Sequence, residues 1–171
     1  LQFRQIENEQ LEQLIRDLQQ RVHTMSLVHE KLYKSPSLSR IDLAGFIRDL
    51  ARELLHSYNR PPELVKLDLA LEPVTLSVDY TIPCGLIINE LLTNTLKYAF
   101  SAGQQGTIFI RLKTLDDQQV LLSICDDGPG YPELSDWGKS TTTGLRLIHL
   151  LSSQLRGEYQ SFNAPGACFE L

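Results

Sequence analysis

Hydrophobic side chains recur every seven residues through the first 34 positions, and no Gly or Pro interrupts them before Pro36. The seam is formed by Leu11, Leu18, Met25 and Leu32, flanked by Leu14, Ile15, Val22 and Val28. This spacing predicts one long helix that packs against another helix. No other segment offers an equal antiparallel partner, so we expect pairing with a second chain, or with a helix upstream of this sequence.

Shorter periodic segments fill the rest of the chain. Helices are predicted over residues 43–58, 82–99 and 143–155, and strands over residues 64–69, 74–78, 107–114, 119–125, 157–161 and 167–171. We expect Asp42 to cap the first of these helices and Pro83 to lie in the first turn of the second. The order of elements predicts an α+β fold, in which helices cover one face of a mixed or antiparallel sheet.

The predicted helix at 82–99 carries three polar residues on an otherwise apolar surface. Glu90, Asn94 and Lys97 are four and three residues apart, so their side chains are neighbours. A carboxylate, an amide oxygen and an ammonium in one row suit a water, a Mg²⁺ ion and a phosphate. A solvated polar face explains the same stripe when this helix is considered alone.

A loop rich in Gly and Pro follows the strand that ends at Cys125. In the run from Asp126 to Gly130, Gly128 and Gly130 allow a sharp turn and a close approach to a ligand. Asp126 is placed to accept a hydrogen bond from an amino group. Plain turn chemistry explains Asp-Gly and Pro-Gly pairs equally well.

The next helix opens with the run Thr141-Thr142-Thr143-Gly144-Leu145. Free N–H groups and the helix dipole at such a start favour an anion such as a phosphate. Capping of the helix by Thr142 or Thr143 is compatible with that role. A third glycine-led turn, Gly166 to Phe169, enters the last predicted strand.

Composition narrows the class of protein. The net charge of −5 disfavours a nucleic-acid surface. No apolar run is long enough for a membrane span, and we expect no signal peptide. The three cysteines are Cys84, Cys125 and Cys168; their wide spacing fits buried, reduced thiols in a cytoplasmic protein and does not suggest zinc.

The four motifs together resemble one family. The Asn89–Lys97 helix, Asp126-x-Gly128-x-Gly130, Thr143-Gly144-Leu145 and Gly166-x-x-Phe169 occur in the order of the N box and three glycine boxes of the Bergerat fold. Sensor histidine kinases, DNA gyrase, the Hsp90 chaperones and MutL share this ATP-binding fold. The resemblance covers roughly residues 64–171.

The closer resemblance is to bacterial sensor histidine kinases. Residues 21–33 are similar to the second dimerisation helix of one subgroup, and the run Ile82–Leu91 is also typical of it. The resemblance implies a two-layer α/β sandwich preceded by a dimerisation helix. It divides the chain into residues 1–40, the dimerisation and phosphotransfer helix, and residues 41–171, the ATP-binding domain.

The resemblance also implies residue roles. Asn94 would ligate Mg²⁺ at the ATP phosphates, Lys97 would contact phosphate, and Tyr98 would line the nucleotide pocket. Glu90 would be the catalytic residue that orients the attacking nucleophile. On the base side, the remaining nucleotide-binding residues would be Asn89 on the same helix, Asp126 at the adenine amino group, and Gly128 and Gly130 below the lid. At the phosphates they would be Thr142, Thr143, Gly144 and Leu145.

Three departures from the family pattern qualify these roles. Thr142 stands where the second glycine box usually has its first glycine, and Ala167 stands where the third often has Thr. The His-Arg-x-x-Asn-Asn box of the phosphorylated histidine is absent, so we expect the acceptor upstream and little autophosphorylation by this chain alone. His29 is an alternative acceptor, but Pro36 follows it by seven residues rather than the usual five; His23 is a weaker candidate.

The family further implies a response regulator as the receiver of the phosphate. Two alternatives remain open: a serine kinase of the anti-sigma-factor type, and a non-catalytic dimerisation module whose nucleotide site has decayed. The lid, about residues 131–142, is expected to be mobile because it contains Gly138, Ser140 and Thr141.

Overall fold

A computed structural model describes residues 2–34, 40–100, 104–116, 119–131, 137 and 142–171. Within the first helix, the side chains of residues 2–10, 13, 32 and 34 lie outside this description. The predicted lid falls largely outside the described residues as well, including Gly138, Ser140 and Thr141.

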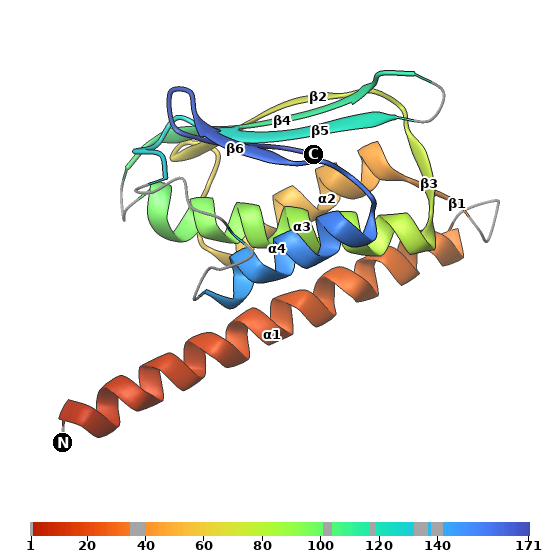
Figure 1. Cartoon of the computed structure of the whole chain (residues 1–171). Helices are drawn as coiled ribbons and strands as arrows, with labels where there is room; N and C mark the ends of the chain where they lie inside the picture. Colours follow the sequence, from red (N-terminus) through yellow and green to blue (C-terminus); the bar gives the residue numbers. More distant parts are fainter. Residues whose placement is uncertain (1, 35–39, 101–103, 117–118, 132–136, 138–141) are drawn as a thin grey trace.

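The chain forms four α-helices, one π-helical turn and seven strands among the described residues (Figure 1). The helical elements are α1 (Gln2–Lys34), α2 (Leu43–Ser57), α3 (Val78–Asn94), η1 (Thr95–Ala99) and α4 (Thr143–Gln154). The strands are β1 (Arg40–Asp42), β2 (Val65–Leu71), β3 (Thr75–Ser77), β4 (Gly106–Thr114), β5 (Val120–Asp126), β6 (Gln160–Asn163) and β7 (Ala167–Glu170). The predicted α+β class is confirmed.

The main sheet is mixed, as expected. Its strand order is β2-β4-β5-β7-β6, with β2 parallel to β4 and the other neighbours antiparallel. The expected hairpin is formed by β4 and β5. The expected strand at 74–78 does not join this sheet: β3 pairs with β1, a short strand that the sequence pattern did not predict.

Helices α2, α3 and α4 form a layer on one face of the sheet, and α1 crosses the far side of that layer (Figure 1). The core between sheet and helices is apolar and includes the fully buried Phe46, Ile87, Ile110 and Phe169. Each such side chain contributes about 1.5–3 kcal/mol by leaving water. This core fixes α3 and α4 against the ends of β5 and β7.

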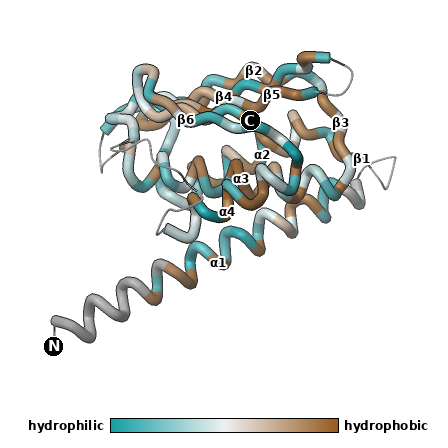
Figure 2. The backbone as a smooth tube through the Cα atoms, viewed as in Figure 1, coloured by the Kyte–Doolittle hydropathy of each residue, from teal (hydrophilic) through white to brown (hydrophobic). Residues whose placement is uncertain are grey.

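Helix α1 buries only one of its faces. Thr24, Leu27 and Val28 are buried against the domain, so Val28 does not belong to the outer seam as expected. The exposed hydrophobic side chains of α1 that run along the predicted seam are Leu11, Leu14, Ile15, Leu18, Val22 and Met25. Figure 2 shows hydrophobic positions recurring along this helix, outside the domain body. An uncovered stripe of this length is typical of a surface that packs against another helix.

The central helix α3 differs from the prediction at both ends. It begins at Val78 rather than residue 82, so Pro83 lies inside the helix and not in its first turn. It ends in the π-helical turn η1, a rare geometry that is frequent at functional sites. Asp42 occupies the N-cap position of α2, but its side chain makes no capping hydrogen bond.

The cysteines also differ from the expectation of three reduced thiols. Cys125 and Cys168 are joined by a disulfide, while Cys84 is free and buried. The cause is register: β5 pairs with β7 so that these two residues face each other, with Cα atoms 4.1 Å apart. Spacing along the sequence, 43 residues, gives no sign of this pairing. The expectation of free thiols is therefore wrong for Cys125 and Cys168 and holds for Cys84.

Candidate functional site

Asp126, the last residue of β5, is the centre on which three motifs meet. Its carboxylate is buried, with 1% of the residue exposed. Oδ1 accepts hydrogen bonds from the backbone N–H groups of Gly128, at 3.0 Å, and Ala167, at 3.1 Å. Oδ2 accepts one from the hydroxyl of Thr95, at 3.0 Å. Since a carboxylate oxygen can accept about two hydrogen bonds, Oδ2 retains capacity for one further donor.

Glycines allow the close packing around this carboxylate. A Cβ at Gly166 would lie 2.4 Å from the carbonyl oxygen of Asp126 and 2.6 Å from the nitrogen of Gly128. A Cβ at Gly128 would in turn lie 2.7 Å from that of Ala99 in η1. Only residues without a side chain fit these two positions. The first and third glycine motifs and the end of α3 are therefore in direct contact.

The turn after Asp126 is tied to the hairpin between β6 and β7. Gly130 has φ +81°, in the left-handed region that favours glycine. The next residue, Tyr131, donates its backbone N–H to Asn163 Oδ1 at 2.8 Å and accepts from Asn163 Nδ2 at 3.1 Å. Burial raises the pKa of Tyr131, and the charge of Asp126 adds to the effect.

Trp137 packs against β7. Its ring is buried and stacks on Phe169, with ring centroids 5.5 Å apart. Tyr159 and Tyr131 complete the cluster at 5.7 Å and 5.5 Å. The described part of the predicted lid is thus fixed to the sheet by aromatic packing.

The start of α4 lies against the polar stripe of α3. A Cβ at Gly144 would be 2.7 Å from Oε2 of Glu90, so the glycine leaves the space that this carboxylate fills. Thr142 occupies the N-cap position, but its side chain makes no capping hydrogen bond, and Thr143 opens the helix. The expected phosphate site and the expected catalytic Glu90 are therefore adjacent.

Two predicted site residues are engaged by α1. Arg21 donates to both carboxylate oxygens of Glu90, at 2.7 Å from Nε and 3.1 Å from Nη2. The hydrogen bond to Glu90 raises the pKa of Arg21, against the opposing effect of burial. Lys97 donates to Asp17 at 2.7 Å.

Asn89 faces α1. It is buried beneath α1, where its Oδ1 accepts from the hydroxyl of Thr24 at 3.2 Å. Tyr98 is 73% exposed in η1, on open surface rather than in a closed pocket. The expected nucleotide contact of Asn89 is not favoured by this burial, whereas Tyr98 remains accessible.

The residues present fit a magnesium ion held together with phosphates. Among the described residues, no group of three or more His, Cys, Asp and Glu could form a metal site. Asn94, half-buried on α3, offers one amide oxygen. Mg²⁺ is usually bound by one or two protein groups plus substrate phosphates, so a single ligand of this kind suffices.

Several contributing residues were not predicted. Thr95 follows Asn94 directly, and a hydroxyl on the apolar face of a helix was the only signal for its role. Arg60 donates to the carbonyl oxygens of Phe100, at 2.8 Å, and Leu96, at 3.4 Å, and so holds the end of η1. No local pattern points to Arg60, because its partners are distant in sequence.

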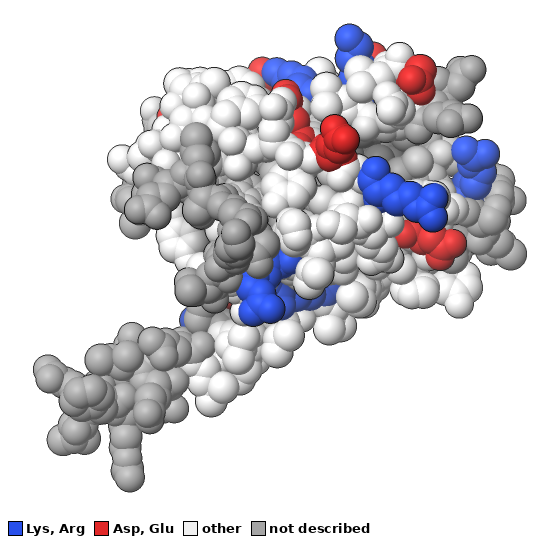
Figure 3. Space-filling view, in the orientation of Figure 1, with Lys and Arg blue, Asp and Glu red and all other residues white. Residues whose placement is uncertain are grey.

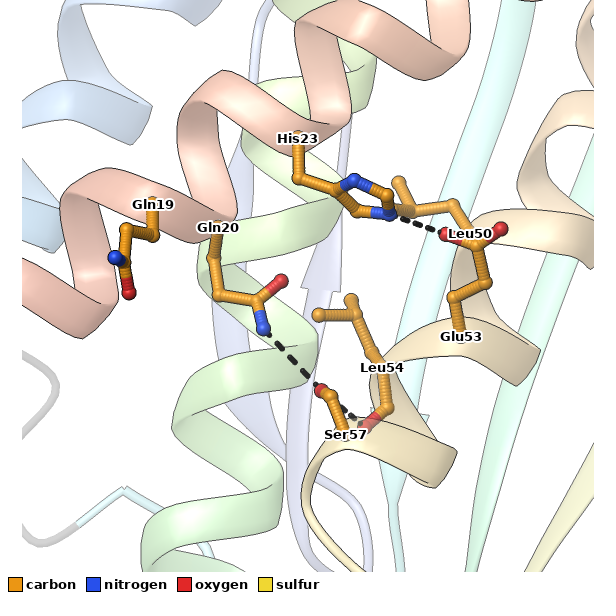
Figure 4. Close-up of a pocket in the computed structure, with 7 residues that line it drawn as sticks. All are labelled: Gln19, Gln20, His23, Leu50, Glu53, Leu54 and Ser57. Carbon is orange, nitrogen blue, oxygen red and sulfur yellow. Dashed lines mark hydrogen bonds and ion pairs between the residues drawn. The ribbon is translucent and has the colours of Figure 1, made fainter.

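A separate hollow lies between α1 and α2 (Figure 4). There His23 Nε2 lies 2.5 Å from Glu53 Oε2, and Gln20 donates to Ser57 at 3.3 Å. This hollow shares no residue with the Asp126 site. His23, the weaker of the two alternative acceptors, is thus engaged with α2, and His29 is exposed on α1.

Comparison with known proteins identifies the class. The family described as "Histidine kinase-, DNA gyrase B-, and HSP90-like ATPase" matches residues 81–171, more than half of the chain. The chain belongs to this family. The family described as "Histidine kinase" matches residues 1–58. The two matches together place the chain among the histidine kinases, and the predicted resemblance is confirmed.

Individual relatives agree with this assignment. Blue-light-activated histidine kinase 2 of Erythrobacter litoralis is 26% identical over 145 residues, which are 82% of this chain and 41% of the relative. Sensor histidine kinase PdtaS of Mycolicibacterium smegmatis is 23% identical over 167 residues, 96% of this chain and 33% of the relative. This chain thus spans less than half of either protein.

Solved structures show the same fold. The histidine kinase domain of the Erythrobacter litoralis EL346 blue-light activated histidine kinase superposes with a TM-score of 0.79 at 24% identity, covering 90% of this chain and 72% of that one. The Acinetobacter baumannii histidine kinase AdeS gives a TM-score of 0.61 at 24% identity, covering 98% and 81%. No helix among the described residues is long and apolar enough to cross a membrane.

Proposed function

We propose that this chain is the catalytic core of a sensor histidine kinase, which binds ATP with Mg²⁺ and transfers the γ-phosphate to a histidine. The observation that carries the proposal is the convergence of Thr95, Gly128 and Ala167 on the buried carboxylate of Asp126. A buried, pre-oriented carboxylate with one acceptor position left is suited to recognise an amino group.

Such recognition would favour adenine over guanine. The adenine amino group donates hydrogen bonds, whereas guanine carries an acceptor oxygen at the same position. Asp126 Oδ2 would accept from the adenine amino group and would oppose the guanine oxygen. Gly128, Gly130 and Gly166 allow the backbone to approach the base closely.

The phosphates would lie between α3 and the start of α4. The backbone N–H groups of Thr143, Gly144 and Leu145 favour an anion there, with Thr142 beside them. Lys97 would add a positive charge at the phosphates. Asn94 would hold Mg²⁺, which neutralises charge on the transferred phosphoryl group when bound.

In the transfer step, an imidazole nitrogen attacks the γ-phosphorus, the bond to the bridging oxygen breaks, and ADP leaves. Glu90 would accept a hydrogen bond from the other ring nitrogen and so orient the nucleophile. The acceptor histidine would come from a segment outside this sequence. Relay to a response regulator aspartate would follow.

The exposed seam of α1 supports a homodimer formed through this helix. We keep the division at residue 40 between the dimerisation helix and the ATP-binding domain. A cytoplasmic location is proposed from the use of ATP alone, since the argument from reduced cysteines no longer holds.

Calorimetric titration tests the nucleotide site. We expect ATP to bind this chain with micromolar to millimolar affinity, Mg²⁺ to strengthen binding, and GTP to bind much more weakly. Absence of ATP binding at millimolar concentration would reject the catalytic proposal and favour the non-catalytic dimerisation module.

A further inference from the structure

The disulfide between Cys125 and Cys168 lies on the outer face of the main sheet. Side chains alternate along a strand, and the neighbouring Ile124 and Phe169 are buried in the core, so the two cysteines point the other way. Helices α2, α3 and α4 cover the opposite, inner face (Figure 1). Figure 3 shows acidic and basic side chains on the sheet side of the molecule, which is therefore exposed to water.

The disulfide closes the ladder between β5 and β7 directly beside the Asp126 site. At the end of β5 the paired residues are Cys125 and Cys168. Asp126 comes next along the chain, and Ala167, which donates its backbone N–H to Asp126 Oδ1, comes just before Cys168. The cross-link thus joins the two strand ends that supply the carboxylate and one of its three hydrogen-bond donors.

Breaking the disulfide would loosen these strand ends. Two non-bonded sulfur atoms cannot approach as closely as a bonded pair, so two thiols need more room than the cross-link. The tight packing of Gly166, where a Cβ would lie 2.4 Å from the carbonyl oxygen of Asp126, depends on the same separation of the strands. We therefore expect the hydrogen bond from Ala167 to Asp126 to be weakened in the reduced chain.

The bond can be opened and closed by thiol–disulfide exchange. Cys125 is half-buried and Cys168 is 2% exposed, so a small dithiol reaches the sulfur of Cys125. Its thiolate attacks Cys125 Sγ, and Cys168 leaves as a thiolate and takes up a proton. The second thiol of the reagent then releases Cys125, which also takes up a proton, and forms a disulfide within the reagent. Two electrons and two protons have then passed to the protein, and a small disulfide reverses both steps.

The fold accommodates the reduced state as well as the oxidised one. Ser123 Oγ lies 3.7 Å from Cys125 Sγ, and the carbonyl oxygen of Ala164 lies 3.6 Å from Cys168 Sγ. Each of these oxygens can accept a hydrogen bond from a freed thiol. Reduction therefore leaves two thiols that have partners in place, which suits a reversible change.

We propose that Cys125 and Cys168 form a dithiol–disulfide switch for the nucleotide site, with higher affinity for adenine in the oxidised chain than in the reduced chain. This inference rests on the proposed function of the site. ATP is used in the cytoplasm, where thiol reductants keep most cysteines reduced and a disulfide is usually transient and catalytic or redox-sensing. A bond in this position suits a sensor, because it adjoins the proposed adenine site and takes no part in the transfer step.

The test uses the unmodified chain in two redox states. Calorimetry measures the binding of adenosine and of Mg-ATP to the oxidised chain, to the chain reduced with dithiothreitol, and to the chain reoxidised with glutathione disulfide. We expect reduction to weaken the binding of both ligands by about three- to tenfold, and reoxidation to restore it. Cys84→Ala is the matched control, since Cys84 is free and buried, and this variant should respond to reduction as the unmodified chain does.

The outcomes separate this inference from the proposed function. Equal affinity in the two states, or tighter binding after reduction, overturns the switch while the nucleotide site stands. A reduced chain that has lost its circular-dichroism signal also overturns it, because the disulfide would then be needed for folding alone. Absence of ATP and adenosine binding in both states rejects the proposed function, and the inference with it.

Hydrogen exchange without nucleotide locates the effect of reduction. Exchange should become faster at the amides of Gly128 and Ala167, which donate to Asp126, and stay the same in α2. Unchanged exchange at both amides contradicts the loosening of the strand ends. An equal increase in α2 contradicts a local switch, because the whole domain would then be destabilised.

Discussion

Among the described residues, the hydrogen bonds to the Asp126 carboxylate come from η1, the turn after β5 and β7, whereas the ion pairs of Glu90 and Lys97 are formed with α1. We call the first region the base half of the site, made of Asp126, Thr95, Gly128, Gly166 and Ala167. We call the second the phosphate half, made of Glu90, Asn94, Lys97 and residues 142–145. The base half is complete as it stands, and the phosphate half depends on where α1 lies.

The two halves suit two different tasks, recognition of the base and handling of the phosphates. Recognition of a base needs a fixed geometry, and the buried carboxylate of Asp126 with its three donors would supply it in the proposed site. Phosphate binding and transfer need charged groups, and in this structure those of Glu90 and Lys97 are paired with α1.

The largest effect is expected for Asp126→Asn, which alters the carboxylate at the centre of the base half. The amide oxygen can still accept from Gly128 and Ala167, but the amide nitrogen then replaces Oδ2 and presents a donor, not an acceptor, to the adenine amino group. Hydrogen bonds to charged groups contribute about 1.5–3 kcal/mol, so ATP affinity should fall by about tenfold or more. Calorimetry measures this loss. Asp127→Asn is the control, since Asp127 accepts from the Thr107 backbone at 2.7 Å, outside the base half.

Gly166→Ala should disturb the same region through packing. Its new Cβ meets backbone atoms of Asp126 and Gly128 that cannot move aside. Overpacking of this kind lowers the free energy of unfolding by about 1–3 kcal/mol. Gly157→Ala is the matched variant, because its Cβ comes closest to the flexible end of the Leu171 side chain, at 2.7 Å, and lies 3.8 Å from the nearest backbone atom. Urea denaturation should show a clear loss for the first variant and a small change for the second.

Thr95→Val should give a smaller effect in the base half. It removes one of the three hydrogen bonds of Asp126 at almost constant shape, which costs about 1.5 kcal/mol in stability, the low end of the range for a charged acceptor, and several-fold in ATP affinity. Thr93→Val provides the contrast. Within the described part of the chain, the buried Thr93 hydroxyl has no partner, so its removal should leave stability equal or higher. Equal losses in the two variants would contradict the role assigned to Thr95.

The smallest effect is expected in the chemical reactivity of the Cys84 thiol. Burial raises the pKa of this thiol to about 12, and the thiolate is the reactive form, so the folded chain should react very slowly with iodoacetamide at pH 8. The unfolded, unreduced chain should then show one thiol, and the reduced chain three. A count of three thiols before reduction would contradict the Cys125–Cys168 disulfide.

The base half was largely predictable from sequence, and the phosphate half only in part. Asp126, Gly128 and Gly166 stand in local motifs whose spacing already indicates a turn at a strand end. Their convergence follows from the pairing of β5 with β7. The stripe of Glu90, Asn94 and Lys97 was predicted from helical spacing, but not the pairing of its charged members with α1.

What could not be predicted depends on tertiary geometry. The contacts of Lys97 with Asp17 and of Glu90 with Arg21 join residues that are 80 and 69 positions apart. The disulfide depends on strand register, and η1 depends on how the end of α3 packs. Among the described side chains of α1, the heptad pattern predicted the exposed seam correctly except at Val28, because a helix with two contact faces obeys no single repeat; Leu32 lies outside these side chains.

The most direct test of the two halves is an amide NMR titration of this chain, first with adenosine and then with Mg-ATP. We expect adenosine to shift the amide signals of Gly128 and Ala167 and to leave those of Lys97 and α1 unchanged. Mg-ATP should shift the first pair in the same way and, in addition, move Lys97, Gly144 and residues 17–24. Shifts of α1 with adenosine alone, or none at Lys97 with Mg-ATP, would contradict the separation of the site into a base half and a phosphate half.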